Sequence, residues 1–241
     1  MIKVENIETW GFEHAIRGMR NPMNSWEKSD SYENFTVEWS EDNPPVEIRR
    51  PYYRIGAADL SLMRRLYSAG PEHRKYLRQI FVSMDITAPL YWWKEFDTYK
   101  VGTVANSCST MHKIAAKPFE LDDFSWEQLL NTGCDLFNLE FDKGLFSTKV
   151  QPLGFLAHFI IPSLNVCREK YLETKDKKYW WQLIQLLPSS YNQRRTVTMN
   201  YENVISMIHQ RTGHKLDEWN DFVKVLEDLP YIKEITEEAC V

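Results

Sequence analysis

The chain has 241 residues, of which 43% are hydrophobic and 26% charged, and its formal net charge is −5 at pH 7. This composition is that of an average globular domain and argues against disorder over most of the length. The negative charge argues against nucleic acid as a partner, because neutralising phosphates requires a basic face. No apolar run reaches the roughly 18 residues of a membrane span, and the N-terminal residues carry charge where a signal peptide would be apolar. We therefore expect a cytoplasmic protein without a membrane partner.

Cysteine and histidine spacing gives no sign of a metal site. The four cysteines are widely scattered, at Cys108, Cys134, Cys167 and Cys240. Their spacing supports neither zinc binding nor a disulfide framework, which fits a reducing compartment. The histidines at 112, 158, 209 and 214 also lack the spacing of metal ligands. We expect no metal, and no His or Asp is placed by sequence to activate Cys108 as a nucleophile.

The N-terminal third predicts a long excursion followed by two helices. Residues 21–54 are polar, contain prolines and are interrupted by aromatic residues, so we expect an ordered but irregular excursion. Ala57–Ala69 has helical periodicity and ends at Gly70. Pro71 can open a second helix, with His73 in its first turn.

The middle of the chain predicts a strand that leads into a helix. Apolar residues alternate with polar or aromatic ones from Ile80 to Ile86, which is the period of a strand. Pro89 then opens an aromatic helix, LYWWKEFDTYK. The small-residue segment from Val101 to Thr110 that follows suits a loop lying close to a ligand.

The C-terminal part predicts helices. Helical patterns run from Gln151 to Leu172, from Lys178 to Leu187, from Asn200 to Gln210 and from Leu216 to Leu229. We group residues 186–230 as a C-terminal helical block within a single domain over 1–241. Helices, a strand and more helices make the fold α+β. Neither GxGxxG nor GxxxxGK[ST] occurs, so a nucleotide must be held in another way.

Three segments stand in an order and spacing that is similar to one enzyme family. Glu72-His73 precedes the predicted strand, and Ala88-Pro89 leads into the aromatic helix. The segment LLPSSYNQRRTVTMNYENVISMIHQRTGHKLDEW begins at Leu186, and Ala15-Ile16-Arg17 lies near the N-terminus. Together they resemble the flavin-dependent thymidylate synthases, over about residues 12 to 225.

The resemblance implies a fold, a reaction and an assembly. The fold would be a central antiparallel sheet flanked by helices. The reaction would be reductive methylation of dUMP to dTMP, with FAD as cofactor and with NADPH and methylenetetrahydrofolate as co-substrates. The flavin would carry the redox chemistry, so the protein would chiefly bind, orient and polarise. The assembly would be a homotetramer with its sites at subunit interfaces.

The family signature RHRxxSxxxxSxR aligns over Thr98–Thr110, and much of it is replaced. Thr98, Tyr99 and Lys100 stand for Arg-His-Arg, so only Lys100 keeps a charge. Thr103 replaces the first serine with another hydroxyl, Cys108 replaces the second serine and Thr110 replaces the closing arginine. Outside the signature, Glu95 replaces a glutamine, and Ile184 and Glu202 each replace an arginine.

The remaining matches give the candidate site residues. The resemblance implies cofactor contacts from four residues: His73, Lys100, Thr103 and Asn200. It implies substrate contacts from Asn106, Ser107, Ser109, Arg194, Arg195 and Arg211. Arginines in such a site grip phosphates and stabilise negative charge on the pyrimidine, so Lys100 and Arg211 are the catalytic candidates.

Each candidate also has an ordinary structural explanation. Arg194 and Arg195 could be a solvated basic pair, and a cation such as Arg211 stabilises the end of a helix. His73 could cap a helix, and the polar segment around Ser107 could be a plain turn. The alternative to an enzyme is therefore a non-catalytic descendant that binds a nucleotide, or only its own partners. A third reading, an unrelated interaction protein, would lack the strand-to-helix step at Pro89.

Overall fold

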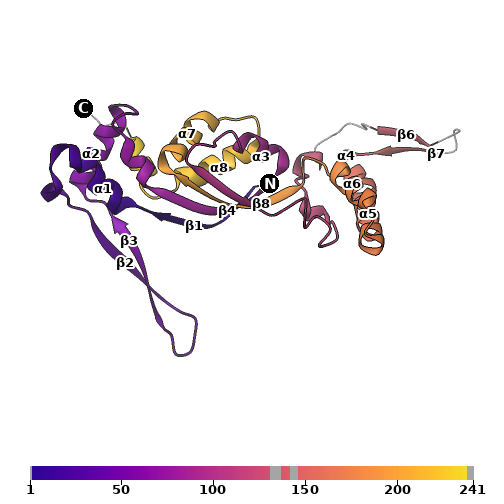
Figure 1. Ribbon diagram of the computed structural model, residues 1–241, viewed down its shortest axis with the longest axis horizontal. Coiled ribbons are helices and arrows are strands. Elements are labelled where there is room, and N and C mark those ends of the chain that lie inside the picture. Colours follow the sequence, from indigo (N-terminus) through magenta and orange to yellow (C-terminus); the bar gives the residue numbers. More distant parts are fainter. Residues whose placement is uncertain (1, 131–136, 142–145, 238–241) are drawn as a thin grey trace. The chain divides into compact units, whose positions relative to one another are not determined.

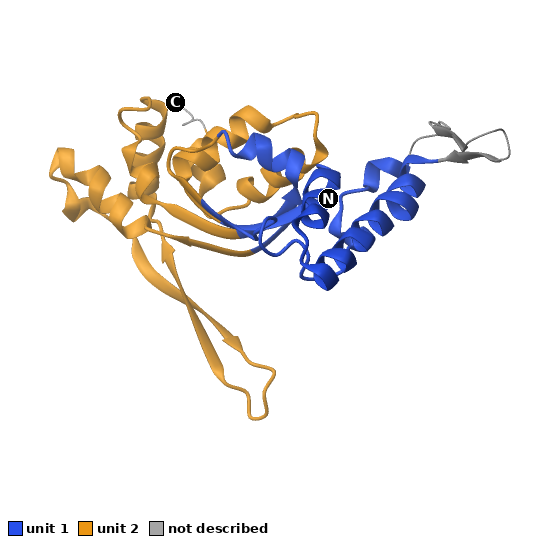
Figure 2. Cartoon of the chain, turned by 45° about the vertical axis from the view of Figure 1, so that its right-hand side comes forward, with its two compact units in different colours: residues 1–5, 85–98, 105–196 blue, residues 6–84, 99–104, 197–241 orange. Residues whose placement is uncertain are grey.

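The computed structural model describes residues 2–130, 137–141 and 146–237 (Figure 1). The chain divides into two compact units (Figure 2). Unit 1 comprises residues 1–5, 85–98 and 105–196, and unit 2 comprises residues 6–84, 99–104 and 197–241. Strands β1 (Lys3–Trp10), β4 (Phe81–Pro89), β5 (Thr103–Ser107) and β8 (Asn192–Asn200) contribute residues to both units. The single domain over 1–241 stays a prediction.

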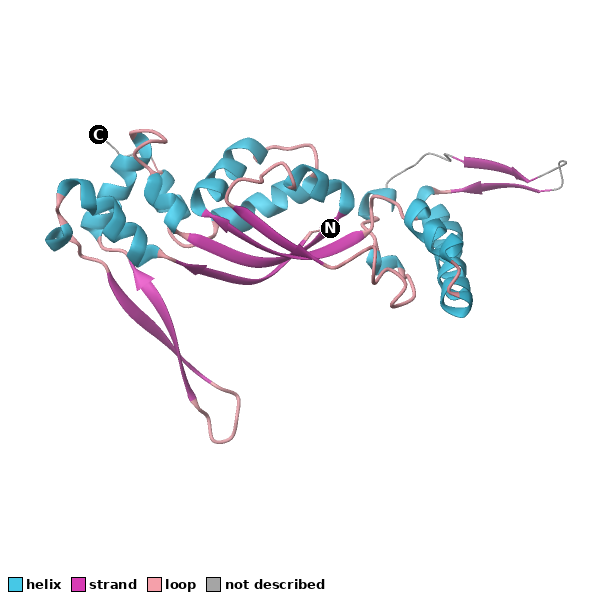
Figure 3. Ribbon diagram, in the orientation of Figure 1, coloured by secondary structure: helices cyan, strands magenta, loops and turns pink. Residues whose placement is uncertain are grey.

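A four-stranded antiparallel sheet, flanked by helices, is the main β element (Figure 3). Its strand order is β1-β4-β8-β5, with β1 Lys3–Trp10, β4 Phe81–Pro89, β8 Asn192–Asn200 and β5 Thr103–Ser107. Strand β4 runs directly into helix α3 (Leu90–Phe96). The predicted strand and the strand-to-helix step at Pro89 are therefore confirmed.

Unit 2 contains several helices. They are α1 (Phe12–Arg20), α2 (Ala57–Ser68), α7 (Tyr201–Arg211), α8 (Asp217–Glu227) and α9 (Ile232–Thr236), with short 3-10 helices at Asn21–Met23, Trp26–Lys28 and Lys75–Gln79. Of these, α2, α7 and α8 were predicted from the sequence pattern. Helix α7 packs against α8 and against the 3-10 helix Lys75–Gln79. The sequence predicted a second helix from Pro71, but no helix begins there. That stretch is a turn, in which the backbone N–H groups of His73 and Arg74 both donate to the Gly70 carbonyl oxygen, at 3.1 and 3.3 Å.

Residues 21–54 are more regular than the predicted excursion. They contain an antiparallel hairpin of β2 (Tyr32–Trp39) and β3 (Glu47–Arg54), in which Phe35 is paired with Pro51. The hairpin extends away from the rest of unit 2 (Figure 1). Proline cannot donate to a β ladder, but it is tolerated in an edge strand such as β3.

Unit 1 has an apolar core to which its helices and residues 114–124 contribute. Besides α3, its helices are α4 (Pro152–Phe155), a π-helix at Leu156–Ile160, α5 (Ile161–Thr174) and α6 (Lys177–Leu186), with 3-10 helices at Leu121–Asp123 and Glu127–Leu130. Leu164 and Leu183 are fully buried, and Phe119 and Phe124 pack with them. Strands β6 (Phe137–Phe141) and β7 (Phe146–Val150) form a second antiparallel pair. The predicted helices at 151–172 and 178–187 are confirmed, but block 186–230 begins with strand β8 and is not helical throughout.

The structure also bears on the predictions about membrane spans and cysteines. Among the described residues, none of the helices combines the length and the apolar character that crossing a membrane requires. Cys108 and Cys167 are free thiols, and Cys134 and Cys240 lie outside the described residues.

A buried ion pair ties three segments of unit 2 together. Arg20 in α1 donates through Nε to Oδ1 of Asp59 in α2, at 2.6 Å, and both side chains are almost fully buried. Oδ2 of Asp59 accepts from the hydroxyls of Ser29 and Ser31, at 2.7 and 2.6 Å. Burial opposes ionisation of Asp59, but hydrogen bonds from Ser31, Ser29 and Arg20 outweigh it and hold its pKa below the usual value.

We predict that Asp59→Asn lowers the free energy of unfolding by about 3 kcal/mol or more, because it leaves the Arg20 charge buried and uncompensated. The measurement is urea unfolding followed by circular dichroism. The control is Asp221→Asn, which removes an exposed ion pair with Lys224. It should change the free energy of unfolding by about 0.5 kcal/mol or less. Because the folded pKa of Asp59 is depressed, its contribution is complete above about pH 4 and is lost as pH falls further. An equal loss in both variants would contradict the prediction.

Candidate functional site

The ten predicted site residues fall into two groups of five. Unit 2 holds His73, Lys100, Thr103, Asn200 and Arg211, and unit 1 holds Asn106, Ser107, Ser109, Arg194 and Arg195. Each group has its own local geometry.

In unit 2, Asn200 joins the end of β8 to the start of α7. Its Oδ1 accepts from the backbone N–H of Asn203 at 3.0 Å, which caps the helix. The side-chain amide of Asn203 donates to the Val101 carbonyl oxygen at 2.6 Å and to Thr103 Oγ1 at 3.1 Å. The structure thus brings Thr103 and Asn200 together, with Asn203 between them.

Gly102 allows the segment to pass this close to the helix. Its φ of +74° lies in the left-handed region, and a Cβ there would stand 2.5 Å from Asn200 Nδ2 and 3.0 Å from Asn203 Nδ2. The left-handed φ favours glycine at this position, and a Cβ there would displace the two side-chain amides.

Arg211 closes α7 and is held by side chains of its own unit. Its Nε donates to the Tyr99 hydroxyl at 2.9 Å, and its Nη1 lies 3.1 Å from Nε2 of His214. The guanidinium also lies over the ring of buried Trp219, 4.5 Å from the ring centroid. Tyr99 in turn donates to Gln210 Oε1 at 3.0 Å. The geometry therefore gives Arg211 a structural role that the sequence did not reveal.

A polar cleft of about 370 Å³ lies along α7. Its lining residues are Arg74, Leu77, Glu202, Asn203, Ile205, Ser206, His209 and Gln210. Asn203 and Gln210 are also hydrogen-bonded to Val101 and Tyr99. The segment Tyr99–Val101 therefore lies along α7, beside the cleft. Lys100 lies between these two anchors and is exposed.

Arg74 is the most distinctive group in the cleft. Its Nε is buried and has no hydrogen-bond partner, and it lies 4.0 Å from the Glu202 carboxylate. Its guanidinium stacks on Tyr67, 5.3 Å from the ring centroid. Glu202 binds Arg78 more closely and raises the pKa of that guanidinium. A buried N–H without an acceptor is costly, and the rest of the Arg74 side chain, which is 28% exposed, lines the cleft. His73 is exposed next to it and makes no hydrogen bond to Thr103 or Asn200.

In unit 1, both predicted phosphate-binding arginines have carboxylate partners. Arg194 binds Asp85 at 2.8 Å and lies 3.9 Å from Glu5. Arg195 binds Asp97 at 2.7 Å and Gln193 Oε1 at 2.9 Å. The Asp85 carboxylate raises the pKa of Arg194, so the positive charge of this residue is largely balanced.

The polar segment after β5 lies beside the same strand as these arginines. The Cys108 N–H donates to the Arg194 carbonyl oxygen at 2.9 Å, and Gln193 Nε2 donates to the Cys108 carbonyl oxygen at 2.8 Å. Ser109 Oγ accepts from the His112 N–H at 3.0 Å and so stabilises a turn. The segment expected to be a loop is thus partly strand, because Thr103–Ser107 form β5, in which Asn106 and Ser107 are exposed.

Sequence reasoning missed several residues that shape the cleft. Arg74, Asn203, Ser206 and Gln210 were not singled out, and neither was the pairing of Tyr99 with Arg211. The spacing Asn200-x-x-Asn203 at the start of a helix is a capping signal that could have identified Asn203. Among the described residues, no group of His, Cys, Asp and Glu side chains is arranged to hold a metal ion.

Comparison with known proteins places the fold. No family model matches the sequence, and no curated protein matches it in sequence. Two structures of the flavin-dependent thymidylate synthase ThyX from Helicobacter pylori with FAD and dUMP are similar to the chain, each with a TM-score of 0.61. They are 15% and 17% identical to it, covering 98% and 99% of this chain and 97% and 99% of theirs. A UMP/dUMP methylase, PolB from Streptomyces cacaoi, bound with 5-Br dUMP has a TM-score of 0.55 at 14% identity, covering 94% of this chain and 88% of its own.

At these identities the similarity establishes the fold. The chain has the α+β fold of the flavin-dependent thymidylate synthases, with an antiparallel sheet flanked by helices. This confirms the predicted fold class, and the strand-to-helix step at Pro89, which the third reading would lack, is present.

We predict that Tyr99→Phe lowers the free energy of unfolding by about 1–2 kcal/mol, because Arg211 Nε and Gln210 Oε1 both lose their partner. Tyr52→Phe is the control, because the Tyr52 hydroxyl accepts one hydrogen bond among the described residues, from Asn34, at 3.0 Å at an exposed position. This variant should change the free energy of unfolding by about 0.5 kcal/mol or less. The measurement is urea unfolding, and equal stability of the two variants would show that the Tyr99 hydroxyl does not hold Arg211.

Proposed function

We propose that this chain binds a pyrimidine mononucleotide such as dUMP or UMP in the polar cleft along α7. One observation carries the proposal. The fold matches, over nearly its whole length, two kinds of enzyme whose structures contain dUMP or a brominated dUMP. The cleft adds the chemistry that such a ligand requires.

The described residues fit a single phosphate group. The Arg74 side chain is 28% exposed and lines the cleft, and phosphate oxygens are strong acceptors for a guanidinium. Lys100 is exposed beside the cleft and can add a second positive charge. The amides of Asn203 and Gln210 and the hydroxyl of Ser206 offer both donors and acceptors, as the edge of a uracil ring requires.

The same residues fit the diphosphate of FAD poorly. Glu202 brings a carboxylate into the cleft where the family has an arginine, and Thr98 and Ile184 replace two more arginines of the family. Arg211 is already held by Tyr99, His214 and Trp219. FAD would therefore need cations from a second subunit. We propose FAD binding only together with the homotetramer that the family resemblance implies.

Two functions follow for a nucleotide bound in this way. The first is FAD-dependent reductive methylation of dUMP to dTMP, or a related reaction on a pyrimidine deoxynucleotide, with NADPH and methylenetetrahydrofolate as co-substrates. The second is nucleotide binding without catalysis. The intramolecular partners of Arg194, Arg195 and Arg211 favour the second, because these arginines were the expected phosphate ligands.

We predict that Arg74→Gln weakens dUMP binding about tenfold or more, because it removes one charge-assisted hydrogen bond to the phosphate. The measurement is isothermal titration calorimetry with dUMP. Lys75→Gln removes the same charge from the neighbouring exposed position, which does not line the cleft, and should leave the affinity within about twofold. Equal loss in both variants would indicate general electrostatic attraction and would contradict this site.

The visible absorbance spectrum separates the two functions. We expect the methylase to show a bound-flavin spectrum that shifts on addition of dUMP, in a protein whose mass by light scattering is that of a tetramer. Nucleotide binding without any flavin signal, after incubation with FAD, would identify the non-catalytic protein. A flavin spectrum in a monomer would contradict the link between FAD and assembly.

A further inference from the structure

A second cleft, of about 610 Å³, lies at the base of the β2–β3 hairpin in unit 2. It is formed by the end of β1, the start of α1, the hairpin and the segment before α9. Its lining residues are Thr9, Trp10, Gly11, Phe12, Glu13, His14, Glu33, Pro51, Tyr52, Tyr53, Pro230, Tyr231 and Glu234. The volume lies within the range of small-molecule sites. None of these residues lines the polar cleft along α7.

Aromatic side chains form the walls of this cleft, and the structure holds them in place. The Tyr231 hydroxyl donates to the Tyr53 carbonyl oxygen and accepts from the Ile55 N–H, each at 3.1 Å. The rings of Phe12 and Tyr231 meet edge to face, 5.5 Å apart. Tyr231 itself has a φ of +63°, in the left-handed region that an aromatic residue rarely adopts. The cleft is therefore organised before any ligand binds.

Trp10 supplies a partly exposed aromatic surface at the same place. It stacks on Phe81 with ring centroids 5.8 Å apart and an interplanar angle of 21°, and 44% of its surface remains exposed. The position of its ring is thus fixed on one side only. The free surface suits contact with a flat or cationic group.

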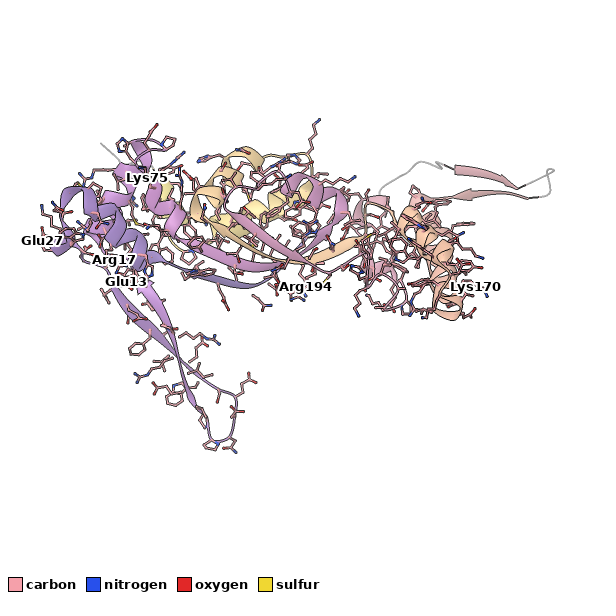
Figure 4. All side chains as sticks on the ribbon, viewed as in Figure 1. Glu13, Arg17, Glu27, Lys75, Lys170 and Arg194 are labelled. Carbon is pink, nitrogen blue, oxygen red and sulfur yellow. The ribbon has the colours of Figure 1, made fainter. Side chains whose placement is uncertain are left out.

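The charged residues that line the cleft are mainly acidic. Three glutamates, Glu13, Glu33 and Glu234, line it, and His14 is the only lining residue that can carry a positive charge. Glu13 lies 3.9 Å from Arg17, and both side chains are well exposed. Figure 4 shows Glu13 on α1 at the base of the hairpin. In the described part of the chain, no ion pair neutralises Glu33 or Glu234.

We infer that this cleft binds a small organic cation, an amidinium, guanidinium or ammonium group on a planar or apolar body. Aromatic faces attract a cation through their quadrupole, and the carboxylates balance its charge. The apolar body gains from contact with Phe12, Tyr53 and Trp10. An anion such as a nucleotide would meet three carboxylates here, so the inference is independent of the proposed function.

Benzamidine and benzamide form a matched pair of probes, because they share size and shape and differ in charge. We expect the full chain to bind benzamidine at least tenfold more tightly than benzamide, measured by saturation-transfer NMR titration. The preference should shrink as NaCl is raised, since the carboxylates are exposed. Equal binding of the two probes, or no binding of benzamidine, would overturn the inference.

Variants locate the binding. We expect Glu33→Gln combined with Glu234→Gln to weaken benzamidine binding about tenfold and to leave benzamide unaffected. Glu41→Gln combined with Glu38→Gln removes the same charge elsewhere on the hairpin segment, outside the cleft, and should change the affinity less than twofold. Because all four positions are exposed, none of these changes should unfold the protein. Equal effects of the two double variants would place the cation elsewhere and overturn the inference.

Discussion

Asn200 stands where strand β8 turns into helix α7, and the geometry of the polar cleft depends on its side chain. One face of the amide caps the helix through Asn203, and the other lies against Gly102, which has no side chain to displace it. The Asn203 side chain then donates to Val101 and Thr103, and these bonds fix the segment 99–103 relative to the start of the helix. Asn203, Ser206 and Gln210 all project from α7 into the cleft, so its polar lining takes its position from this junction.

The arginines of the chain differ in how firmly they are held, and this decides which could turn to a ligand. Arg195 is 14% exposed, stacks on Trp93 at 4.1 Å and binds both Asp97 and Gln193. Arg194 is 47% exposed and binds only carboxylates, and exposed ion pairs contribute little free energy. A phosphate dianion could compete with Asp85 for Arg194, but releasing Arg195 would break a stacked and hydrogen-bonded arrangement.

The sequence predicted the elements whose apolar pattern is local. Strand β4 alternates cleanly, and α2, α6, α7 and α8 show a helical period, so their limits fell within one to three residues of those observed. Strand β8 also alternates, with Val197 and Met199 buried, but the polar residues around them obscured it. In β2, Phe35, Val37 and Trp39 alternate with polar residues, but the nearby prolines suggested an irregular segment.

The site was less accessible to prediction, because its contacts join residues far apart in the chain. The family resemblance pointed to Arg211, Thr103 and Asn200, yet the partner of Arg211 is Tyr99, 112 residues away. No periodicity or spacing predicts such a pair. For the same reason, Asp85 and Asp97 could not be recognised as the partners of Arg194 and Arg195. Spacing along the chain could indicate only Asn203, through its local capping bond to Asn200.

The residues that replace family positions near α7 now bind partners within this chain. Tyr99 stands at the histidine of the family signature and connects Arg211 to Gln210 through a neutral hydroxyl, while Glu202 stands at a lost arginine and binds Arg78. The change at Glu202 reduces the positive charge in the cleft along α7, where Nε of Arg74 is a buried donor without a hydrogen-bond partner. A cleft of this kind disfavours a ligand with several phosphates more than a ligand with one. These changes therefore support the proposal of a mononucleotide ligand over that of FAD.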